Sequence, residues 1–286
     1  MENKHSLSLR TLTVLLGLLV PLFVSCSEGQ TENRQSASSL RVVSLVPSLT
    51  QEMYDLGTEE YLVGCTSFCE PAIADSVEVV ASAMKVGVER ILTLKPDLVL
   101  TSDLIDDKEL QILRTAGIRI ENFPTPKTFQ EVCSEFERLG EVLHKKTVAD
   151  SISQLCQNRV ALVVQSQEKS PSSPRMLLQI GVDPIWVVTK DMYMCDFINL
   201  LNGNNIASEL NSGAVNSEFV LSQNPEYIFV ASMGNSFSQK EHPWSSFASL
   251  DAVKNNRVFI IDASKACQPT PLNFAEVLEK MAALVQ

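Results

Sequence analysis

The chain has 286 residues, a hydrophobic fraction of 45% and a formal net charge of −11 at pH 7. So acidic a balance argues against nucleic acid as a partner, because Lys and Arg supply most of the affinity for a phosphate backbone. The length exceeds what one small core accommodates and therefore indicates two lobes.

The first 25 residues have the character of a secretory signal. Lys4 and Arg10 give a positive start, and the apolar run over residues 12–24 is about 13 residues long, short of the roughly 20 that a membrane-spanning helix needs. We therefore predict that residues 1–25 are a signal removed on export.

Cys26 ends a short motif, residues 22–26 with the sequence LFVSC. The motif resembles the lipobox of bacterial lipoproteins, in which the cysteine is lipidated, although Phe23 stands where leucine is usual. The resemblance implies lipidation at Cys26, and an ordinary signal peptide with an incidental cysteine is the alternative. No large apolar side chain follows until Leu40, so residues 26–39 are expected to be a lipid-anchored, flexible tether.

The first half of the folded part alternates strands and helices. Apolar runs and helical spacing predict strands at 41–45, 97–100 and 119–123 and helices at 49–56, 89–95 and 108–116. Such alternation is typical of a parallel sheet covered by helices on both faces. We predict an α/β lobe over residues 40–126.

A linking segment over residues 127–173 follows, free of proline as far as Gln165. Residues 147–167 are expected to form one backbone helix of roughly 30 Å, and the Ser- and Pro-rich stretch after it a loop. The apolar positions with helical spacing in this segment are Phe129, Val132, Phe136, Leu139, Val142, Leu143, Val148, Ile152 and Leu155.

The second half, residues 174–286, repeats features of the first. Strands are predicted at 175–179 and 257–261 and a helix at 194–201. Glu218 precedes Pro225 by seven residues, as Glu89 precedes Pro96, and an acidic residue follows each proline. In both copies the proline ends a short helix and an apolar run predicts a buried parallel strand. The fold expected is therefore α/β, with two similar Rossmann-like lobes.

The whole plan resembles the periplasmic cobalamin and ferric-siderophore binding proteins, the receptors of ABC importers whose two lobes are joined by a single backbone helix. The resemblance runs from Arg41 to Leu284. Its marks are residues 41–50 (RVVSLVPSLT), 87–91 (GVERI), 95–97 (KPD), 179–184 (QIGVDP) and 269–271 (PTP). It implies a monomer with a ligand cleft between the lobes.

Glu89 and Glu218 are the sharpest pair of candidate residues. The resemblance implies that one glutamate on each lobe pairs with arginines on the membrane subunits of the importer. Two separated anionic points would also fix orientation and speed encounter. The alternative is ordinary stabilisation of a helix N-terminus by a carboxylate.

Ligand contacts are expected at the carboxyl ends of the strands, where open α/β sheets bind ligands. Trp186 is the best single candidate, in a loop after a strand, where a macrocycle would rest on its ring; core packing is the alternative. The full set is Ser48, Leu49, Thr50, Ser67, Phe68, Met84, Lys85, Ser102, Trp186, Tyr193, Met233, Lys265 and Gln268.

The ligand is expected to be a metal chelate. No cluster of His and carboxylates indicates a bare metal site, and no cofactor of the protein's own is predicted. A corrinoid is slightly favoured over a ferric siderophore, because the candidate loops offer few cations. Haem is the alternative, with Tyr193 as the conceivable axial ligand.

The sequence argues against an enzyme. It has no GxGxxG, P-loop, GxSxG or HExxH motif, and its scarce histidines leave no acid–base pair, although a chelatase-like active site is a remaining alternative. We expect a receptor in the cell envelope, anchored on the periplasmic side of the inner or outer membrane. A surface lipoprotein that serves an outer-membrane transporter is a further alternative. Six cysteines follow Cys26, with Cys65 and Cys69 the closest pair, and their spacing fixes no disulfide.

Overall fold

The computed structural model describes residues 39–82, 85–167, 172–231 and 241–285. Residues 1–38, with the predicted signal and lipidation site, and the predicted ligand residues Met84 and Met233 lie outside the described residues. In the part of the chain that is described, no helix has the length and apolar character to cross a membrane.

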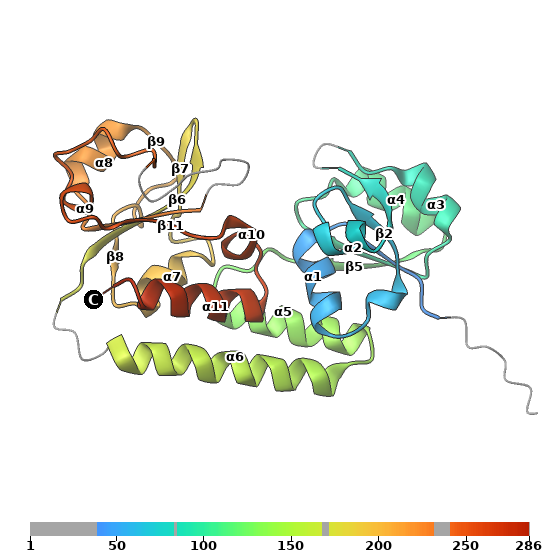
Figure 1. Ribbon diagram of the computed structural model, residues 1–286. Helices are drawn as coiled ribbons and strands as arrows, with labels where there is room; N and C mark the ends of the chain where they lie inside the picture. The colour runs from blue at the N-terminus through green and yellow to red at the C-terminus, as the bar shows by residue number, and fades with distance from the viewer. Residues whose placement is uncertain (1–38, 83–84, 168–171, 232–240, 286) are drawn as a thin grey trace, which may run out of the picture. The chain divides into compact units, whose positions relative to one another are not determined.

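The first sheet is wholly parallel, as predicted (Figure 1). Across it lie β3 (Glu78–Ala81), β2 (Leu62–Thr66), β1 (Val42–Ser44), β4 (Leu98–Ser102) and β5 (Arg119–Phe123). The helices between these strands are α1 (Pro47–Asp55), the 3-10 turn η1 (Glu59–Tyr61), α2 (Glu70–Ala74), α3 (Val88–Leu94) and α4 (Asp107–Thr115). Successive strand residues point to opposite faces, so Val42 packs with α1 and α2, whereas Val43 packs with α3 and α4.

The second sheet is mixed. Across it lie β11 (Val258–Ile260), β10 (Tyr227–Val230), β6 (Arg175–Val182), β7 (Ile185–Val187) and β9 (Ala214–Val215), and β8 (Asn204–Asn205) pairs with β6. The helices are α7 (Cys195–Leu200), α8 (Ser217–Gln223), α9 (Asp251–Lys254), α10 (Ala263–Ala266) and α11 (Pro271–Ala282). Here the prediction of a parallel sheet was incomplete, because Asp183 and Pro184 turn the chain straight back and β7 runs antiparallel to β6.

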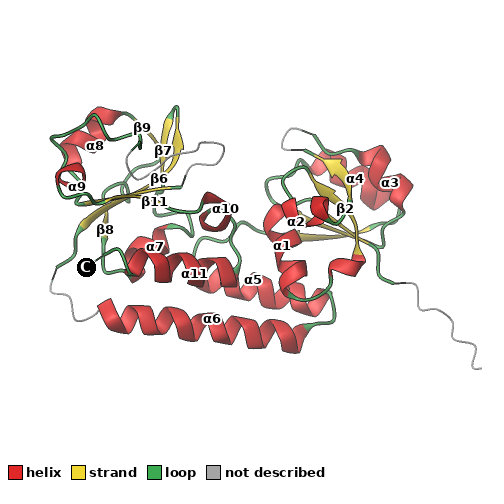
Figure 2. Cartoon of the chain, viewed as in Figure 1, coloured by secondary structure: helices red, strands yellow, loops and turns green. Residues whose placement is uncertain are grey.

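Three helices pack together, and the first two of them contribute to the cores of both lobes. They are α5 (Phe129–Val142), α6 (Lys146–Gln167) and α11, which Figure 2 shows side by side while the strands form two separate groups. Phe274 of α11 stacks on Phe129 and on Phe197, with ring centroids 4.4 Å apart in each pair. Arg159 of α6 pairs with Glu279 of α11 at 2.6 Å.

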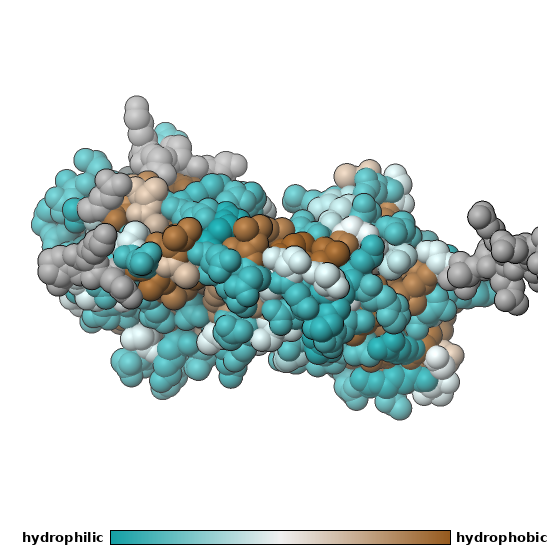
Figure 3. All heavy atoms as spheres, turned by 90° about the horizontal axis from the view of Figure 1, so that it is seen from below, coloured by the Kyte–Doolittle hydropathy of each residue, from teal (hydrophilic) through white to brown (hydrophobic). Residues whose placement is uncertain are grey.

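The buried face of α6 is not the one that carries its larger apolar residues. The side chains that pack inward are small or medium, namely Ala149, Ser153, Cys156, Val160 and Val163. Val148 and Leu155, two of the apolar positions with helical spacing, are 40% and 54% exposed, and Leu162 is 67% exposed. Figure 3, seen from below, shows hydrophobic surface in a band among hydrophilic residues on this side of the molecule. Small side chains face inward because α5 approaches α6 closely: a Cβ at Gly140 of α5 would clash with the Ala149 methyl group of α6.

The duplicated helix–proline–strand unit is confirmed. Both α3 and α8 end in a left-handed residue, Lys95 with φ 48° and Asn224 with φ 43°. The acidic residue after each proline has the same task in both copies. Asp97 accepts a hydrogen bond from the backbone N–H of Arg41 at 2.9 Å, and Glu226 accepts one from that of Arg175 at 3.2 Å.

Candidate functional site

The predicted ligand residues of the first lobe gather at one edge of its sheet. Ser67 and Phe68 follow β2, Lys85 follows β3, and Ser102 is the last residue of β4. Because all five strands are parallel, their carboxyl ends meet at this edge. Phe68 presents its ring to solvent, at 54% exposure, and Ser67 and Lys85 are exposed beside it.

A pocket of about 670 Å³ opens at the β3 side of this edge. Its lining includes the predicted residues Ser67, Lys85 and Glu89. It also includes Arg90 and Glu109, which sequence reasoning missed. Their only sequence signal is position, since Arg90 follows Glu89 and Glu109 lies in the first turn of α4. Charged groups of both signs therefore share one pocket with part of the predicted ligand site.

Two predicted contacts of the first lobe are corrected. Leu49 lies in α1, is 4% exposed and packs in the core of the first lobe. Thr50 is fully buried, and its hydroxyl lies 3.2 Å from the Val46 carbonyl and 3.1 Å from Cys69 Sγ. Helix α1 turns both side chains inward, away from the sheet edge. Ser48 and Ser102 keep 8% and 7% exposure at the edge itself.

Trp186 lies at the carboxyl end of the second sheet, 39% exposed. It is a residue of β7 and not of a loop, which corrects the prediction. Trp186 pairs with Gly181 of β6. Gly181 lies two residues beyond Gln179, the last residue of β6 that pairs with β10. A Cβ at Gly213 would lie 2.6 Å from Trp186 Nε1, so the missing side chain at Gly213 makes room for the indole. One part of this ring is packed and the rest is open to solvent.

Tyr193 and Lys265 both have partners within the second lobe. Tyr193 is 6% exposed, and its hydroxyl donates a 2.6 Å hydrogen bond to the Ala266 carbonyl. Lys265 lies in α10, and its ammonium contacts both carboxylate oxygens of Glu276 at 2.6 Å. This contact and Lys280 hold the pKa of Glu276 at about 2. Gln268 is half-buried between α10 and α11.

Glu89 and Glu218 occupy the same position, the second residue of their helices. Both are exposed, and among the described residues neither carboxylate has an ion-pair or hydrogen-bond partner. In α8 the Asn216 side chain already caps the helix by accepting from the Phe219 N–H at 2.9 Å. Helix capping therefore does not require Glu218, and both carboxylates are open to a partner.

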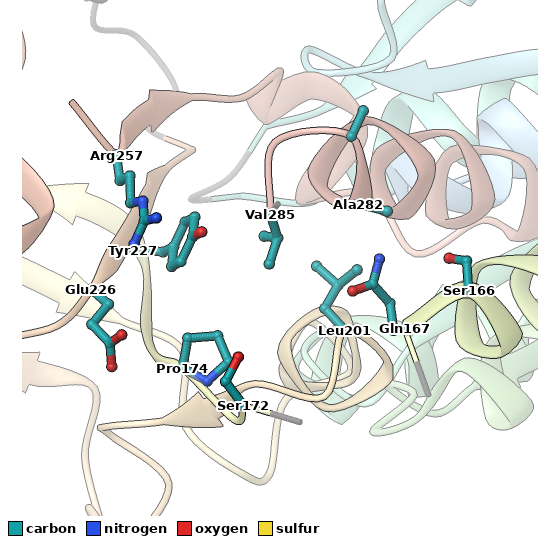
Figure 4. Close-up of a pocket in the computed structure, with 11 residues that line it drawn as sticks. Ser166, Gln167, Ser172, Pro174, Leu201, Glu226, Tyr227, Arg257, Ala282 and Val285 are labelled. Carbon is teal, nitrogen blue, oxygen red and sulfur yellow. The ribbon is translucent and has the colours of Figure 1, made fainter. Parts of the chain in front are cut away.

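A second pocket, of about 650 Å³, lies at the opposite end of the second sheet (Figure 4). It is bounded by the ends of α6 and α11 and by the starts of β6 and β10. The Arg257 guanidinium stacks 4.6 Å over the ring of Tyr227 on one side. None of the predicted site residues lines it. The predicted cleft between the lobes is neither of these two pockets and stays a prediction.

No three His, Cys, Asp or Glu side chains in the described ranges lie close enough to hold a metal ion. The six cysteines after Cys26 are free thiols. His242 is half-buried, which lowers its pKa, and its Nδ1 accepts from the Trp244 N–H at 3.2 Å. The chemistry at the two carboxyl edges is thus that of exposed rings, hydroxyls and a few charges.

Comparison with known proteins gives a consistent picture. A family model described as "Periplasmic binding protein" matches residues 42–265. The uncharacterized ABC transporter substrate-binding lipoprotein YvrC of Bacillus subtilis is 27% identical over 256 residues, 85% of this chain and 78% of the relative. The crystal structure of the periplasmic vitamin B12 binding protein BtuF of Vibrio cholerae has a TM-score of 0.74 at 26% identity, covering 86% and 96% of the two chains. That of the periplasmic heme binding protein HutB of the same species has a TM-score of 0.77 at 19% identity, covering 87% and 99%.

Proposed function

The chain belongs to the periplasmic binding protein family, and from this premise we propose that it is the substrate-binding lipoprotein of an ABC importer for a corrinoid. The observation that carries the proposal is the pair of exposed rings at the carboxyl ends of the two sheets, Phe68 at 54% and Trp186 at 39% exposure. Large flat apolar faces suit a macrocyclic chelate. The likeness to a vitamin B12 binding protein supports the same ligand class.

The charges and possible axial ligands favour a corrinoid over the alternatives. An anionic ferric chelate calls for cations; of the predicted contacts Lys265 is already neutralised by Glu276, which leaves Lys85, in the same pocket as Arg90. Haem calls for an axial Tyr or His. The Tyr193 hydroxyl is bonded to a backbone carbonyl, and His144 lies in the turn between α5 and α6. His242 is half-buried, and its Nδ1 accepts a hydrogen bond from the Trp244 N–H. A heme-binding relative at 19% identity supports the fold alone.

Delivery to a membrane permease is the second half of the proposal. The lipid at Cys26 would hold the folded body on a tether of about 13 residues, whose random-coil reach is roughly 20 Å. A relative that is named a lipoprotein supports the anchor. Glu89 and Glu218, exposed and without partners among the described residues, would meet arginines of the permease.

Titration of the full chain with cyanocobalamin, haem and ferric siderophores, followed by tryptophan fluorescence, tests the ligand. The chain has two tryptophans, and Trp244 is 1% exposed with its Nε1 donating to Gln179, so it serves as the internal reference. We expect cyanocobalamin to quench the fluorescence saturably and Trp186→Ala to remove this quenching. Trp186→Phe should bind cyanocobalamin again, as measured by dialysis. Chemical turnover of the ligand, or unchanged quenching in Trp186→Ala, would contradict the proposal.

A further inference from the structure

The outward face of α6 carries apolar side chains at a regular spacing. Val148, Leu155 and Leu162 recur every seven residues and are 40%, 54% and 67% exposed. Two turns of an α-helix take about seven residues, so these three side chains lie in one row along α6. Figure 3 views the side of the molecule on which Figure 1 draws α6, and it shows hydrophobic surface in a band there.

The rest of this face is uncharged. The eight exposed positions from residue 151 to residue 166 are Ser151, Gln154, Leu155, Asn158, Ala161, Leu162, Gln165 and Ser166. Arg159 is the one charged residue in residues 151–167, all of which the structure describes, and it pairs with Glu279 of α11 at 2.6 Å. About 25–35% of surface residues are ordinarily charged, so roughly two or three charges would be expected at these positions.

The apolar row matches itself when it is turned end to end. Val148 and Leu162 each lie seven residues from Leu155, on opposite sides of it. A two-fold axis through Leu155 would set α6 antiparallel to α6 of a second copy. Leu155 would then face its own counterpart, and Val148 would face Leu162 of the second copy. This is the self-complementary pattern that a two-fold interface between identical chains requires.

The charged start of α6 does not oppose this pairing. Lys146 pairs with Glu141 and with Asp150 of its own chain, each at 3.1 Å. In the antiparallel arrangement residues 146–150 would lie over residues 160–164 of the second copy, which are uncharged. The two helices would therefore bring no like charges together.

We propose that the outward face of α6 is an interface between two copies of this chain, in place of the monomer that the family resemblance implies. A membrane surface fits the face less well, because helices that lie on membranes are rich in Lys and Arg on their polar side. Figure 1 draws α6 on the opposite side of the molecule from α3 and α8, so pairing leaves Glu89 and Glu218 accessible.

The interface is small, and the pair is therefore weak. Helix α6 has 22 residues and is about 33 Å long, so a strip roughly 10 Å wide on each copy gives about 700 Å² in all. Stable interfaces bury about 1,200–2,000 Å², so monomer and pair exchange. The proposed lipid anchor would concentrate copies on one membrane and favour the pair by mass action.

Disulfide cross-linking of the full chain in cells tests the proposal. Leu155→Cys places one thiol from each copy at the two-fold axis, and copper phenanthroline should oxidise them to a cross-linked dimer. Ile112→Cys is the matched control, because Ile112 is 53% exposed but lies on α4. We expect at least about tenfold more dimer from Leu155→Cys on a non-reducing gel, because pairing raises the effective concentration of its thiols. Equal yields would overturn the proposal, as would a cross-link from Leu155→Cys to a different protein only.

Val148→Cys and Leu162→Cys test the antiparallel orientation. Cells that carry both variants, distinguished by tags of different size, should form the mixed dimer. Either variant alone should give no more dimer than Ile112→Cys, because its two thiols would lie 14 residues or about 21 Å apart along the helix. Efficient cross-linking of Val148→Cys to itself would mean a parallel pair and would overturn the axis through Leu155.

An apolar contact between acidic chains also predicts the effect of salt. Each copy has a formal net charge of −11, so the two copies repel at long range. Raising NaCl from about 0.01 M to 0.15 M shortens the screening length from about 30 Å to about 8 Å and should increase cross-linking of the purified Leu155→Cys chain. A decrease would indicate an interface held by charge pairs and would contradict the proposal.

Leu155→Glu tests the centre of the interface. Added to the mixed pair of Val148→Cys and Leu162→Cys chains, it should lower the yield of mixed dimer at least about tenfold, because it buries two like charges against each other. Leu155→Met, which keeps the apolar contact, should retain most of the yield. Equal yields in the two variants would overturn the contact at Leu155. None of these measurements uses a ligand, so their outcome is independent of the proposed function.

Discussion

At the scale of single residues, Glu52 is a buried acid with an unsatisfied oxygen. It is 2% exposed, and its Oε2 has no hydrogen-bond partner among the described residues. Burial raises the pKa of its carboxyl group well above the ordinary value, and the nearby carboxylates of Asp55 and Glu135 raise it further. Burial raises the pKa of Asp55 as well. Glu52 is therefore a protonated group inside the first lobe at pH values where an exposed glutamate is charged.

Glu52→Gln should make the stability of the chain less dependent on pH. The folded chain holds the Glu52 proton to higher pH than the unfolded chain does. The stability that Glu52 contributes is therefore fully present below pH 4.5, its ordinary pKa. It falls as the pH rises toward the folded pKa, by up to about 1.4 kcal/mol per unit. Gln cannot ionise, so urea unfolding at pH 5 and pH 8 should show a smaller difference in the variant. Glu59→Gln, at an exposed position, is the control, and equal pH dependence in all three proteins would contradict the assignment.

Charge reversal at the two exposed glutamates tests the docking role. Glu89→Lys with Glu218→Lys should abolish uptake. Corrinoid affinity should change far less, and any change should come from Glu89, which lines the pocket that contains Ser67 and Lys85. Uptake by cells and binding to the purified chain are measured side by side. Glu209→Lys with Glu60→Lys, two exposed glutamates outside both helices, is the matched control. Unimpaired uptake by the Glu89→Lys, Glu218→Lys variant would contradict a docking role for these two residues.

Residue roles were the least predictable part of the site. The sequence places Ser67, Phe68 and Lys85 at the correct sheet edge because strand order alone decides that position. It did not predict the partners of Tyr193 and Lys265, which are the Ala266 carbonyl and Glu276. Partners of this kind depend on how α10 packs against its neighbours, and the spacing of apolar residues in the sequence does not predict that packing.

At the scale of elements, the contact between α5 and α6 depends on two small residues. Gly140→Ala should destabilise the chain by about 1–3 kcal/mol, because its new methyl group would clash with that of Ala149 and force the helices apart. Urea unfolding measures the loss. Adding Ala149→Gly should recover part of it, less the roughly 1 kcal/mol that glycine costs inside a helix. A Gly140→Ala variant as stable as the parent would show that this crossing tolerates the added volume.

The small residues of α6 also explain why its apolar spacing does not mark its buried face. Large apolar residues usually mark the packed side of a helix, but Val148 and Leu155 recur at helical spacing and stay exposed. Here a close crossing selects small side chains for the inside, and the larger ones remain outside. The existence and length of the helix were predictable from the absence of proline and glycine, whereas its rotation depended on the partner helix.

At the scale of the whole molecule, α5 and α6 belong to the cores of both lobes. Phe129, Val132 and Val160 pack in the core of the second lobe, and Phe136 and Ala149 pack in that of the first. Ile152 contacts both cores. Loss of one lobe would therefore expose part of the other.

Leu100→Ala should reveal this coupling. Leu100 is fully buried in the first sheet, so its truncation is expected to cost about 2–5 kcal/mol. Both tryptophans lie in the second lobe, so their fluorescence should report the same lowered urea midpoint as circular dichroism. A fluorescence transition that keeps the parental midpoint would mean that the lobes unfold independently.

The architecture was largely predictable because its signals are local and repeated. Proline-stopped helices, apolar strand runs and the long proline-free segment each predicted an element that the structure contains. The antiparallel β7 was not predictable from these signals, since a two-residue turn and a helical crossover can both follow the same apolar run. The residues outside the described ranges include Cys26, so the lipid anchor is still a prediction.

The matching positions of Glu89 and Glu218 have a statistical consequence. Each is the second residue of a proline-stopped helix on its own lobe. If a half-turn of the receptor exchanged the two carboxylates, a partner made of two identical subunits would meet nearly the same contacts in two orientations. Two nearly degenerate docked orientations would double the number of productive encounters and favour association by RT ln 2, about 0.4 kcal/mol. Internal duplication would then relax the orientational search that otherwise limits the rate at which two protein surfaces meet.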